Sequence, residues 1–246
     1  MSLGKRKPWT RDELILAINL YCRTPFGRIH IRNPEIIALS ASLGRTPGSV
    51  SYKLANFASI DPTIDRRGAV NVSKLDRAVW NEFFEDWETM IHESETRMAQ
   101  LKQEASTVET SDDYPIKGGE TRSATVEARI NQDFFRKMIL TSYNNVCCIT
   151  GIDNSELLVA SHIVPWARDE KNRLNPMNGL CLNALHDRAF DKGLISIDEG
   201  YKVIVSKKVQ HKLMRQYDRR PIRLPDRFVP DQNFLSFHRD NIYVGN

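Results

Sequence analysis

The amino-acid sequence predicts an α+β protein with a helical N-terminal domain, a long helix and linker, and a C-terminal domain built around a β-hairpin and a helix. Three observations predict this organisation. Apolar residues recur at helical spacing behind capping residues in the N-terminal part. Residues 105–123 lack apolar periodicity and are typical of a linker. The C-terminal part has a short apolar run, an Asn-Gly turn signal and an amphipathic segment. We therefore expect domains at residues 1–104 and 124–246.

The composition argues against a membrane or secreted protein. The chain has 246 residues, of which 41% are hydrophobic, enough to bury a substantial core. No apolar stretch approaches the ~20 residues that span a bilayer, and the basic N-terminus lacks the apolar core of a signal peptide. We therefore expect a cytoplasmic protein with no membrane partner.

The cysteines argue against two kinds of covalent or metal cross-link. The sequence has no CxxC pair among its cysteines, which are Cys22, Cys147, Cys148 and Cys181. We therefore expect neither a structural zinc site nor a disulfide framework. Buried free thiols are expected instead.

The net charge of +4 is unevenly distributed along the chain. Residues 1–60 and 121–246 are each net basic, whereas residues 61–120 are net acidic. Basic faces attract a polyanion by releasing its counterions, while an acidic segment avoids phosphates and is free for packing or self-association. Ordinary surface charge is the alternative interpretation.

The N-terminal part predicts three helices. Thr10 is an N-cap with a glutamate at the third helical position, which is a capping box. A second helix begins after Asn33, where a proline suits the first turn, and ends at a glycine. A third begins after Thr46. Helix, glycine turn and capped helix is the order of a helix-turn-helix, and residues 43–50 are similar to the turns of helix-turn-helix DNA-binding domains.

That similarity makes the third helix the expected recognition element. Arg45 and Lys53 could bind backbone oxygens or guanine, and the small Ser49 permits close approach to a groove or phosphate. Tyr52 could contact a methyl group. The candidate DNA-binding residues are therefore Arg45, Ser49, Tyr52 and Lys53. A three-helix bundle used only for protein contacts is the alternative.

A further helix is expected to run from Ser73 through Ile91. Its aromatic side chains expose more apolar surface than a free linker helix can leave in water. These aromatic residues are Trp80, Phe83, Phe84 and Trp87. They pack either within the chain or on a second copy of it, and both possibilities stay open.

The C-terminal part places two histidines and an asparagine around a predicted hairpin. An apolar run of strand length ends at His162, because Pro165 stops a regular ladder. Asn178 begins a turn, and His186 falls in the first turns of the following helix, whose apolar face includes Leu185. In phosphodiester hydrolysis one neutral imidazole can deprotonate a water while a second holds a metal ion.

These residues resemble the HNH (ββα-metal) family of restriction-type endonucleases. The resemblance extends from about residue 147 to 198; it includes Cys148–Gly151, Ser161–Ile163, Asn178–Leu180, His186-Asp187 and Phe190–Ile195. Residues 235–239 resemble the closing segment of these proteins. The resemblance implies that the catalytic residues are His162 as general base, Asn178 as the residue that orients the hairpin and that base, and His186 as a metal ligand. It also implies a divalent cation, Mg²⁺ or Mn²⁺, and double-stranded DNA as substrate.

One position departs from the family pattern. Many HNH nucleases have Asp or His just before the general base as a second metal ligand, whereas this chain has Ser161. A hydroxyl is a weak ligand for a hard cation, which prefers carboxylate oxygens. Asp187, Asp191, water or substrate phosphate could complete the coordination.

Two classes of function follow from these expectations. The first is a restriction-type DNA endonuclease, whose architecture resembles enzymes that depend on cytosine modification. One metal and one base hydrolyse one strand, so a double-strand break favours a homodimer formed through the acidic, aromatic-rich helix. The second class is a helix-turn-helix DNA-binding regulator with an inactive HNH finger.

Overall fold

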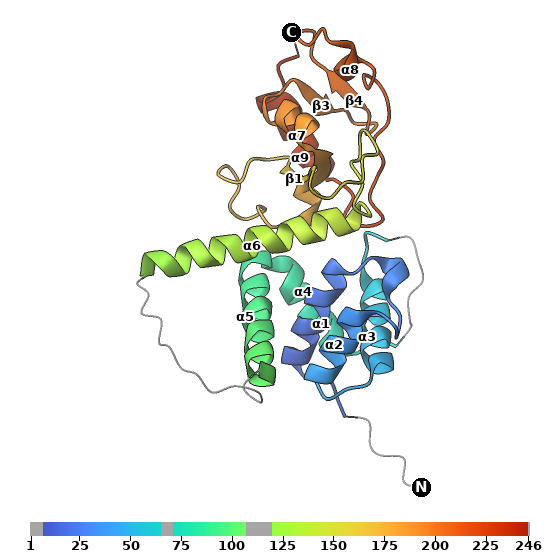
Figure 1. Ribbon diagram of the computed structural model, residues 1–246, viewed down its shortest axis with the longest axis vertical. Coiled ribbons are helices and arrows are strands. Elements are labelled where there is room, and N and C mark those ends of the chain that lie inside the picture. The colour runs from blue at the N-terminus through green and yellow to red at the C-terminus, as the bar shows by residue number, and fades with distance from the viewer. Residues whose placement is uncertain (1–6, 65–70, 107–119, 246) are drawn as a thin grey trace. The chain divides into compact units, whose positions relative to one another are not determined.

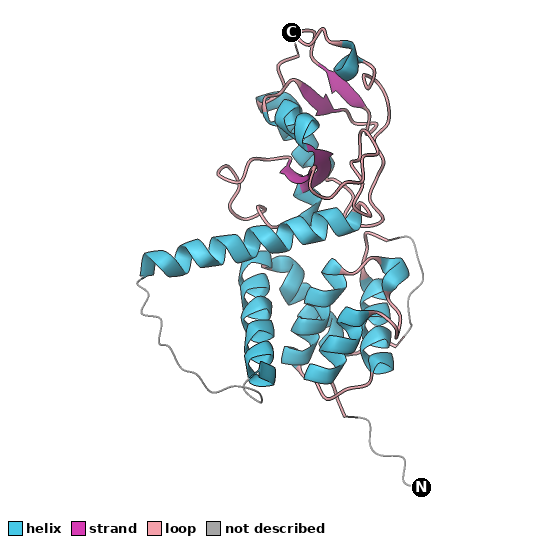
Figure 2. Ribbon diagram, in the orientation of Figure 1, coloured by secondary structure: helices cyan, strands magenta, loops and turns pink. Residues whose placement is uncertain are grey.

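The computed structural model describes residues 7–64, 71–106 and 120–245, and the chain divides into two compact units, Met1–Ile130 and Asn131–Asn246 (Figure 1). Helices dominate the first unit, whereas the second combines helices with two small antiparallel sheets (Figure 2). The predicted α+β class is confirmed. None of the described helices combines the length and the apolar content needed to cross a membrane.

The N-terminal unit packs its helices around a shared apolar core. Its described elements are α1 (Arg11–Arg23), a 3-10 turn (Phe26–Arg28), α2 (Pro34–Ser42), α3 (Pro47–Ile60), α4 (Lys74–Glu85) and α5 (Trp87–Ser106). The three predicted helix starts are confirmed, and Thr10, Asn33 and Thr46 each accept a backbone N–H in the first turn of their helix. Local capping chemistry therefore sets where these helices begin.

The acidic segment forms two helices where the sequence predicted one. Ser73 begins α4 with a capping box, but Asp86 lies between α4 and α5 in a non-helical backbone conformation. The predicted linker overlaps both flanking helices, since α5 ends at Ser106 and α6 begins at Glu120. Its remainder, residues 107–119, lies outside the described residues.

The aromatic side chains of this segment pack within their own unit. Trp80 contacts the rings of Tyr21 and Phe57, with centroids 5.6 and 5.8 Å away, and Trp87 contacts Phe83 at 5.8 Å. Trp80, Phe83 and Trp87 are all buried. The surface expected to pair two chains is therefore part of the core, because burial against α1 and α3 already removes these rings from water.

The C-terminal unit is built on a β-hairpin with helices on both sides. Its described elements are the last turns of α6 (Glu120–Ser142), then β1 (Leu158–His162), a 3-10 turn (Pro176–Asn178), β2 (Gly179–Asn183), α7 (Ala184–Asp191), β3 (Ile195–Ile197), β4 (Val203–Val205), α8 (Lys212–Arg215) and α9 (Gln232–Asn241). β1 pairs with β2 in antiparallel register, which sets His162 opposite Gly179. The predicted strand, hairpin and helix are confirmed. Leu185 differs from expectation, since it is 60% exposed and does not join the apolar face of α7.

The closing segment of the chain holds the end of α7. His238 of α9 stacks on Phe190 with ring centroids 3.7 Å apart, and its Nε2 donates to the Phe190 carbonyl at 3.1 Å. Ser196 Oγ donates to His238 Nδ1 at 2.8 Å, which completes the hydrogen bonds of a neutral imidazole. Gly193 lies beside this contact at a positive φ of 65°, and a Cβ there would meet the carbonyl oxygen of Ile242 at 2.0 Å. This position therefore requires glycine.

The cysteines are buried and free, as expected. Cys147 Sγ accepts hydrogen bonds from the backbone and side chain of Asn183. The Cys147 thiol therefore packs against the end of β2.

Candidate functional site

His162 lies at the end of β1 with its ring held on two sides. It stacks on Phe135 of α6, with centroids 4.1 Å apart and planes 10° from parallel, and Trp166 meets it edge-on at 5.4 Å. Its Nε2 lies 2.8 Å from the carbonyl oxygen of Arg173. Because a carbonyl can only accept, Nε2 carries the proton, and the neutral ring keeps a lone pair on Nδ1. That lone pair is what a general base requires.

The surroundings of His162 favour its neutral form. Burial lowers the pKa of the ring below its ordinary value of 6.5, while the hydrogen bond to Arg173 and the negative charge of Asp187 oppose that shift. The neutral imidazole is therefore the main form at pH 7.

A cavity of about 310 Å³ opens beside this ring. Its lining residues come from α6, β1 and the loop after β1; they are Gln132, Phe135, Arg136, Val159, Ala160, His162 and Trp166. Arg136 donates to the carbonyls of Leu158 and Ser155 at 2.8 and 3.2 Å, which fixes a positive charge at the wall. The cavity has room for a water molecule and a phosphate group beside the His162 imidazole and the Arg136 guanidinium.

Asn178 holds the loop that orients His162. It is fully buried, and its Oδ1 accepts from the backbone N–H of Val164 at 2.8 Å. Its Nδ2 donates to the carbonyls of Val164 and Asn172, each at 3.2 Å. Asn172 directly precedes Arg173, whose carbonyl binds His162. The amide and the imidazole are thus linked through one short stretch of backbone.

His186 lies in the first turn of α7 and is oriented by Asn183. The side-chain Oδ1 of Asn183 lies 3.1 Å from His186 Nδ1 and also accepts the backbone N–H of His186 at 3.0 Å. Since an amide oxygen accepts, Nδ1 carries the proton and Nε2 keeps its lone pair. Nε2 is buried without a hydrogen-bond partner, and burial lowers the pKa of the ring. A neutral imidazole with one oriented and one free nitrogen suits a metal ligand.

The residues around His186 could bind a divalent cation through only a few protein ligands. Ser161 Oγ is a second buried atom without a partner, and strand alternation directs Ser161 to the face of β1 opposite His162. Across residues 7–64, 71–106 and 120–245, no group of three or more His, Cys, Asp or Glu side chains could hold a metal ion. Water and substrate phosphate would have to supply the other ligands.

Asn183 is one of three site residues that the sequence did not predict. An asparagine three residues before a helical histidine is an N-cap pattern, and that signal stands in the sequence. Phe135 and Arg173 were also missed, because nothing local relates them to His162.

The four candidate DNA-binding residues line one cavity in the N-terminal unit. Its volume is about 880 Å³, and Arg45, Ser49, Tyr52 and Lys53 all contribute to its walls. The helical period of α3 places Ser49 and Tyr52 on one face, three residues apart. The structure thus brings together residues chosen one by one from the sequence.

Two of these residues are not free cations. Arg45 donates to Glu13 at 2.7 Å and covers the ring of Trp9 at 4.1 Å, while Lys53 lies 2.7 Å from Asp76 in a buried pair. Burial would raise the pKa of Glu13, but hydrogen bonds from Arg45, the Thr10 backbone and Lys7 lower it to about 2. Both expected phosphate ligands are therefore already neutralised within the protein.

Comparison with known proteins places the hairpin and its histidines in a family. Residues 147–198 match the HNH endonuclease family. The solved structure of the modification-dependent TagI restriction endonuclease aligns with 44% of this chain at 21% sequence identity and a TM-score of 0.34. The chain spans 37% of the length of that protein, an overlap too slight to establish a common fold. No curated protein sequence matches the chain. The C-terminal unit therefore contains a domain of the HNH endonuclease family, at residues 147–198.

Proposed function

We propose that the protein is a metal-dependent DNA endonuclease of restriction type. The observation that carries this proposal is His162, whose Nε2 is anchored on the Arg173 carbonyl while Nδ1 keeps its lone pair, beside a cavity of about 310 Å³. In a domain of the HNH endonuclease family, this geometry suits a base that activates water.

Hydrolysis then follows from the chemistry of His162. Its Nδ1 takes a proton from a water molecule, the water oxygen attacks phosphorus, and the P–O bond to the leaving oxygen breaks. A divalent cation held by His186 would neutralise charge on the phosphate and on that leaving oxygen. Arg136 adds a fixed positive charge at the cavity wall. Asn178 acts as a positioning residue, through the backbone that holds His162.

Each domain holds one base, so each chain cuts one strand at a time. A double-strand break then needs a second chain or a second encounter. A homodimer stays a prediction, although Trp80, Phe83 and Trp87 of the segment expected to form it are buried within the unit. Dependence on modified cytosine also stays a prediction.

Two features favour a second candidate function. Ser161 stands where an acidic or histidine ligand is usual, and His186 Nε2 is buried. Both features would suit a DNA-binding regulator whose HNH domain no longer holds metal.

A plasmid-nicking assay separates the two functions. Supercoiled plasmid is incubated with the full chain in EDTA, Mg²⁺ or Mn²⁺. We expect open circles to appear with metal and not with EDTA. Retarded plasmid with no nicking under any metal would support the regulator instead.

A further inference from the structure

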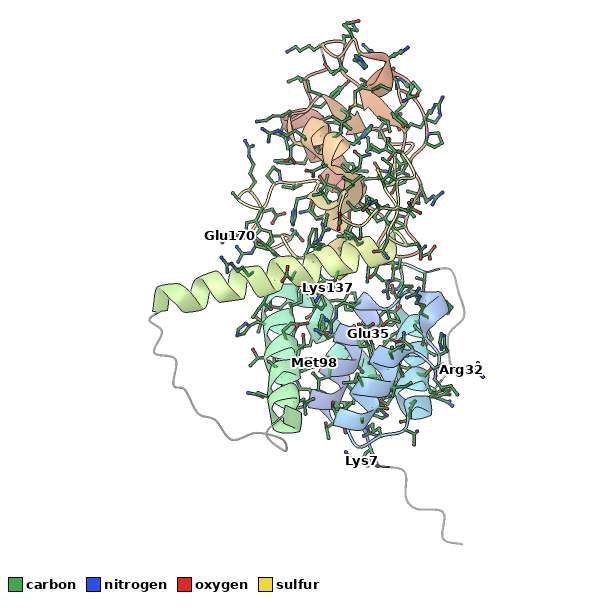
Figure 3. The ribbon with its side chains drawn as sticks, viewed as in Figure 1. Lys7, Arg32, Glu35, Met98, Lys137 and Glu170 are labelled. Carbon is green, nitrogen blue, oxygen red and sulfur yellow. The ribbon has the colours of Figure 1, made fainter. Side chains whose placement is uncertain are left out.

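The cavity of the N-terminal unit has the dimensions of a ligand site. Its volume of about 880 Å³ lies within the range of roughly 300–1,000 Å³ typical of small-molecule pockets. The walls come from the segment before α1, the start and middle of α3, and the residue that precedes α4 by a few positions; they include Lys7, Trp9, Tyr52, Asn56 and Asn71. Lys7 is labelled in Figure 3 at the beginning of the described chain.

Asn56 supplies the observation that points to a ligand. Its side chain is 2% exposed, it lines the cavity, and its Oδ1 is buried with no hydrogen-bond partner. Buried side-chain carbonyls almost always have a partner, so this acceptor lacks a donor, which a ligand in the cavity would supply once the Asn56 amide turns toward it. Asn56 follows Tyr52 by four residues on α3, which places both on one face of the helix.

The aromatic residues supply surfaces for a flat ligand. Tyr52 is 48% exposed, and its hydroxyl accepts a hydrogen bond from Asn71 Nδ2 at 3.2 Å. Trp9 is half-buried, with the Arg45 guanidinium 4.1 Å and the Lys53 ammonium 5.2 Å from its ring centre, so Tyr52 offers the more open face. Aromatic faces of this kind stack nucleobases without regard to sequence.

The charges argue for a neutral ligand in the interior. Arg45 pairs with Glu13, and Lys53 with Asp76, so the two cations of the wall are compensated. Lys7 also contacts Glu13 but is 60% exposed, and it can meet a phosphate at the rim. This distribution of charge favours a nucleotide whose base lies inside the cavity and whose phosphate lies at the rim, over one whose phosphate lies inside.

We infer that this cavity holds one nucleobase of DNA that carries an exocyclic amino group and has left its base stack. The amino group donates to Asn56 Oδ1, in the way that amide side chains read adenine, and the base stacks on Tyr52. The proposal rests on the proposed function and deepens it. The N-terminal unit would read DNA through an extruded base rather than through α3 lying in the major groove.

The test uses the full chain carrying His162→Ala, so that bound DNA is not cut. Fluorescein-labelled single strands of deoxyadenosine, deoxycytidine or thymidine expose their bases without the cost of unpairing, and fluorescence anisotropy gives each Kd. We expect the deoxyadenosine or deoxycytidine strand to bind about ten-fold more tightly than the thymidine strand, because thymine has no amino group. Asn56→Leu should abolish this preference. Asn233→Leu, the same exchange on an exposed residue of α9, should keep it.

Equal affinity for the three strands, or a preference that survives Asn56→Leu, would overturn the proposal. So would tighter binding of an adenosine RNA strand than of its DNA counterpart. If Asn56→Leu does not fold, Tyr52→Ala replaces it, since that side chain is exposed and its loss should weaken binding of all three strands. Unchanged affinity of Tyr52→Ala would contradict stacking.

The nicking assay keeps this proposal separate from the proposed function. Metal-dependent nicking by the wild-type chain without any base preference would reject the base site alone. A base preference lost in Asn56→Leu, with no nicking by the wild type, would reject the nuclease and keep the base site.

Discussion

His162 donates through Nε2 to the carbonyl of Arg173 at 2.8 Å, and this one bond decides which nitrogen can act. The carbonyl holds the tautomer with a free Nδ1, much as an acceptor behind a metal-bound histidine fixes the tautomer of that ring. Arg173 lies eleven residues after His162, across a loop that Asn178 closes from its other end. The base is therefore positioned by backbone, and side chains position that backbone.

The nicking rate should begin to fall with acid only at a pH below the ordinary pKa of histidine. Burial is the largest influence on His162 and lowers its pKa from 6.5, so protonation of the base requires a lower pH. We expect the rate to change little between pH 8 and 6.5 and to fall only below that range. A pH–rate profile at saturating metal checks this expectation, and a midpoint above 6.5 would contradict it.

Removal of the imidazole of His186 should act through metal affinity. His186→Ala deletes the imidazole nitrogen that would bind the cation, so nicking should be lost at ordinary metal concentrations and partly restored at raised Mg²⁺ or Mn²⁺. A titration of the nicking rate against each metal measures this effect. No response at any concentration would assign His186 another role.

Gly179 should tolerate no side chain. A Cβ there would lie 2.4 Å from Ile139 Cδ1 and 2.9 Å from Phe135 Cζ, and Phe135 stacks on His162. Gly179→Ala should therefore cost about 1–3 kcal/mol of unfolding free energy and also slow nicking. Gly200→Ala is the control, because its nearest neighbour would be an ordinary 3.4 Å away. Urea unfolding and nicking rates that match for the two variants would contradict the proposed packing.

Acid should destabilise the C-terminal unit through His238. Burial is the main reason that its pKa falls to about 4, against 6.5 when unfolded. The unfolded chain therefore binds a proton between these values that the folded chain does not. Stability is fully present above pH 6.5 and is lost as pH falls toward 4, by about 3 kcal/mol for this residue.

Urea unfolding at pH 7 and pH 5 measures that loss. His238→Asn cannot titrate and should show a smaller difference between the two pH values than the wild type, whatever its stability at pH 7. Equal differences for the two proteins would exclude His238 as a source of the acid sensitivity.

Local chemistry accounts for what could be predicted from the sequence. The N-caps Thr10 and Thr46 lie within three residues of the groups they bind. The strand ending at His162 and the helix carrying His186 likewise follow from short apolar patterns, and their spacing matches a known family. The order of residues determines such features without help from the rest of the chain.

Long-range pairing accounts for what could not be predicted. The sequence predicted Lys53 as a ligand for DNA, but its ammonium group is buried against Asp76, twenty-three residues later. From the sequence, Trp80 could pack within its own chain or on a second copy. Its contact with Tyr21 of another helix shows that it packs within the chain. Phe135 reaches His162 from α6, across a separation that no local pattern encodes. Tertiary packing determines these contacts, and no local pattern in the sequence predicts them.

The nicking rate of His162→Ala tests the nuclease assignment most directly. The control is His211→Ala, which removes an exposed histidine of the same unit, and plasmid retardation measures DNA binding by each variant. A general base contributes roughly 10²–10⁴-fold to a rate, so His162→Ala should nick at least a hundred-fold more slowly than the wild type while still retarding plasmid. His211→Ala should match the wild type. Nicking by His162→Ala within ten-fold of the wild-type rate would contradict the account.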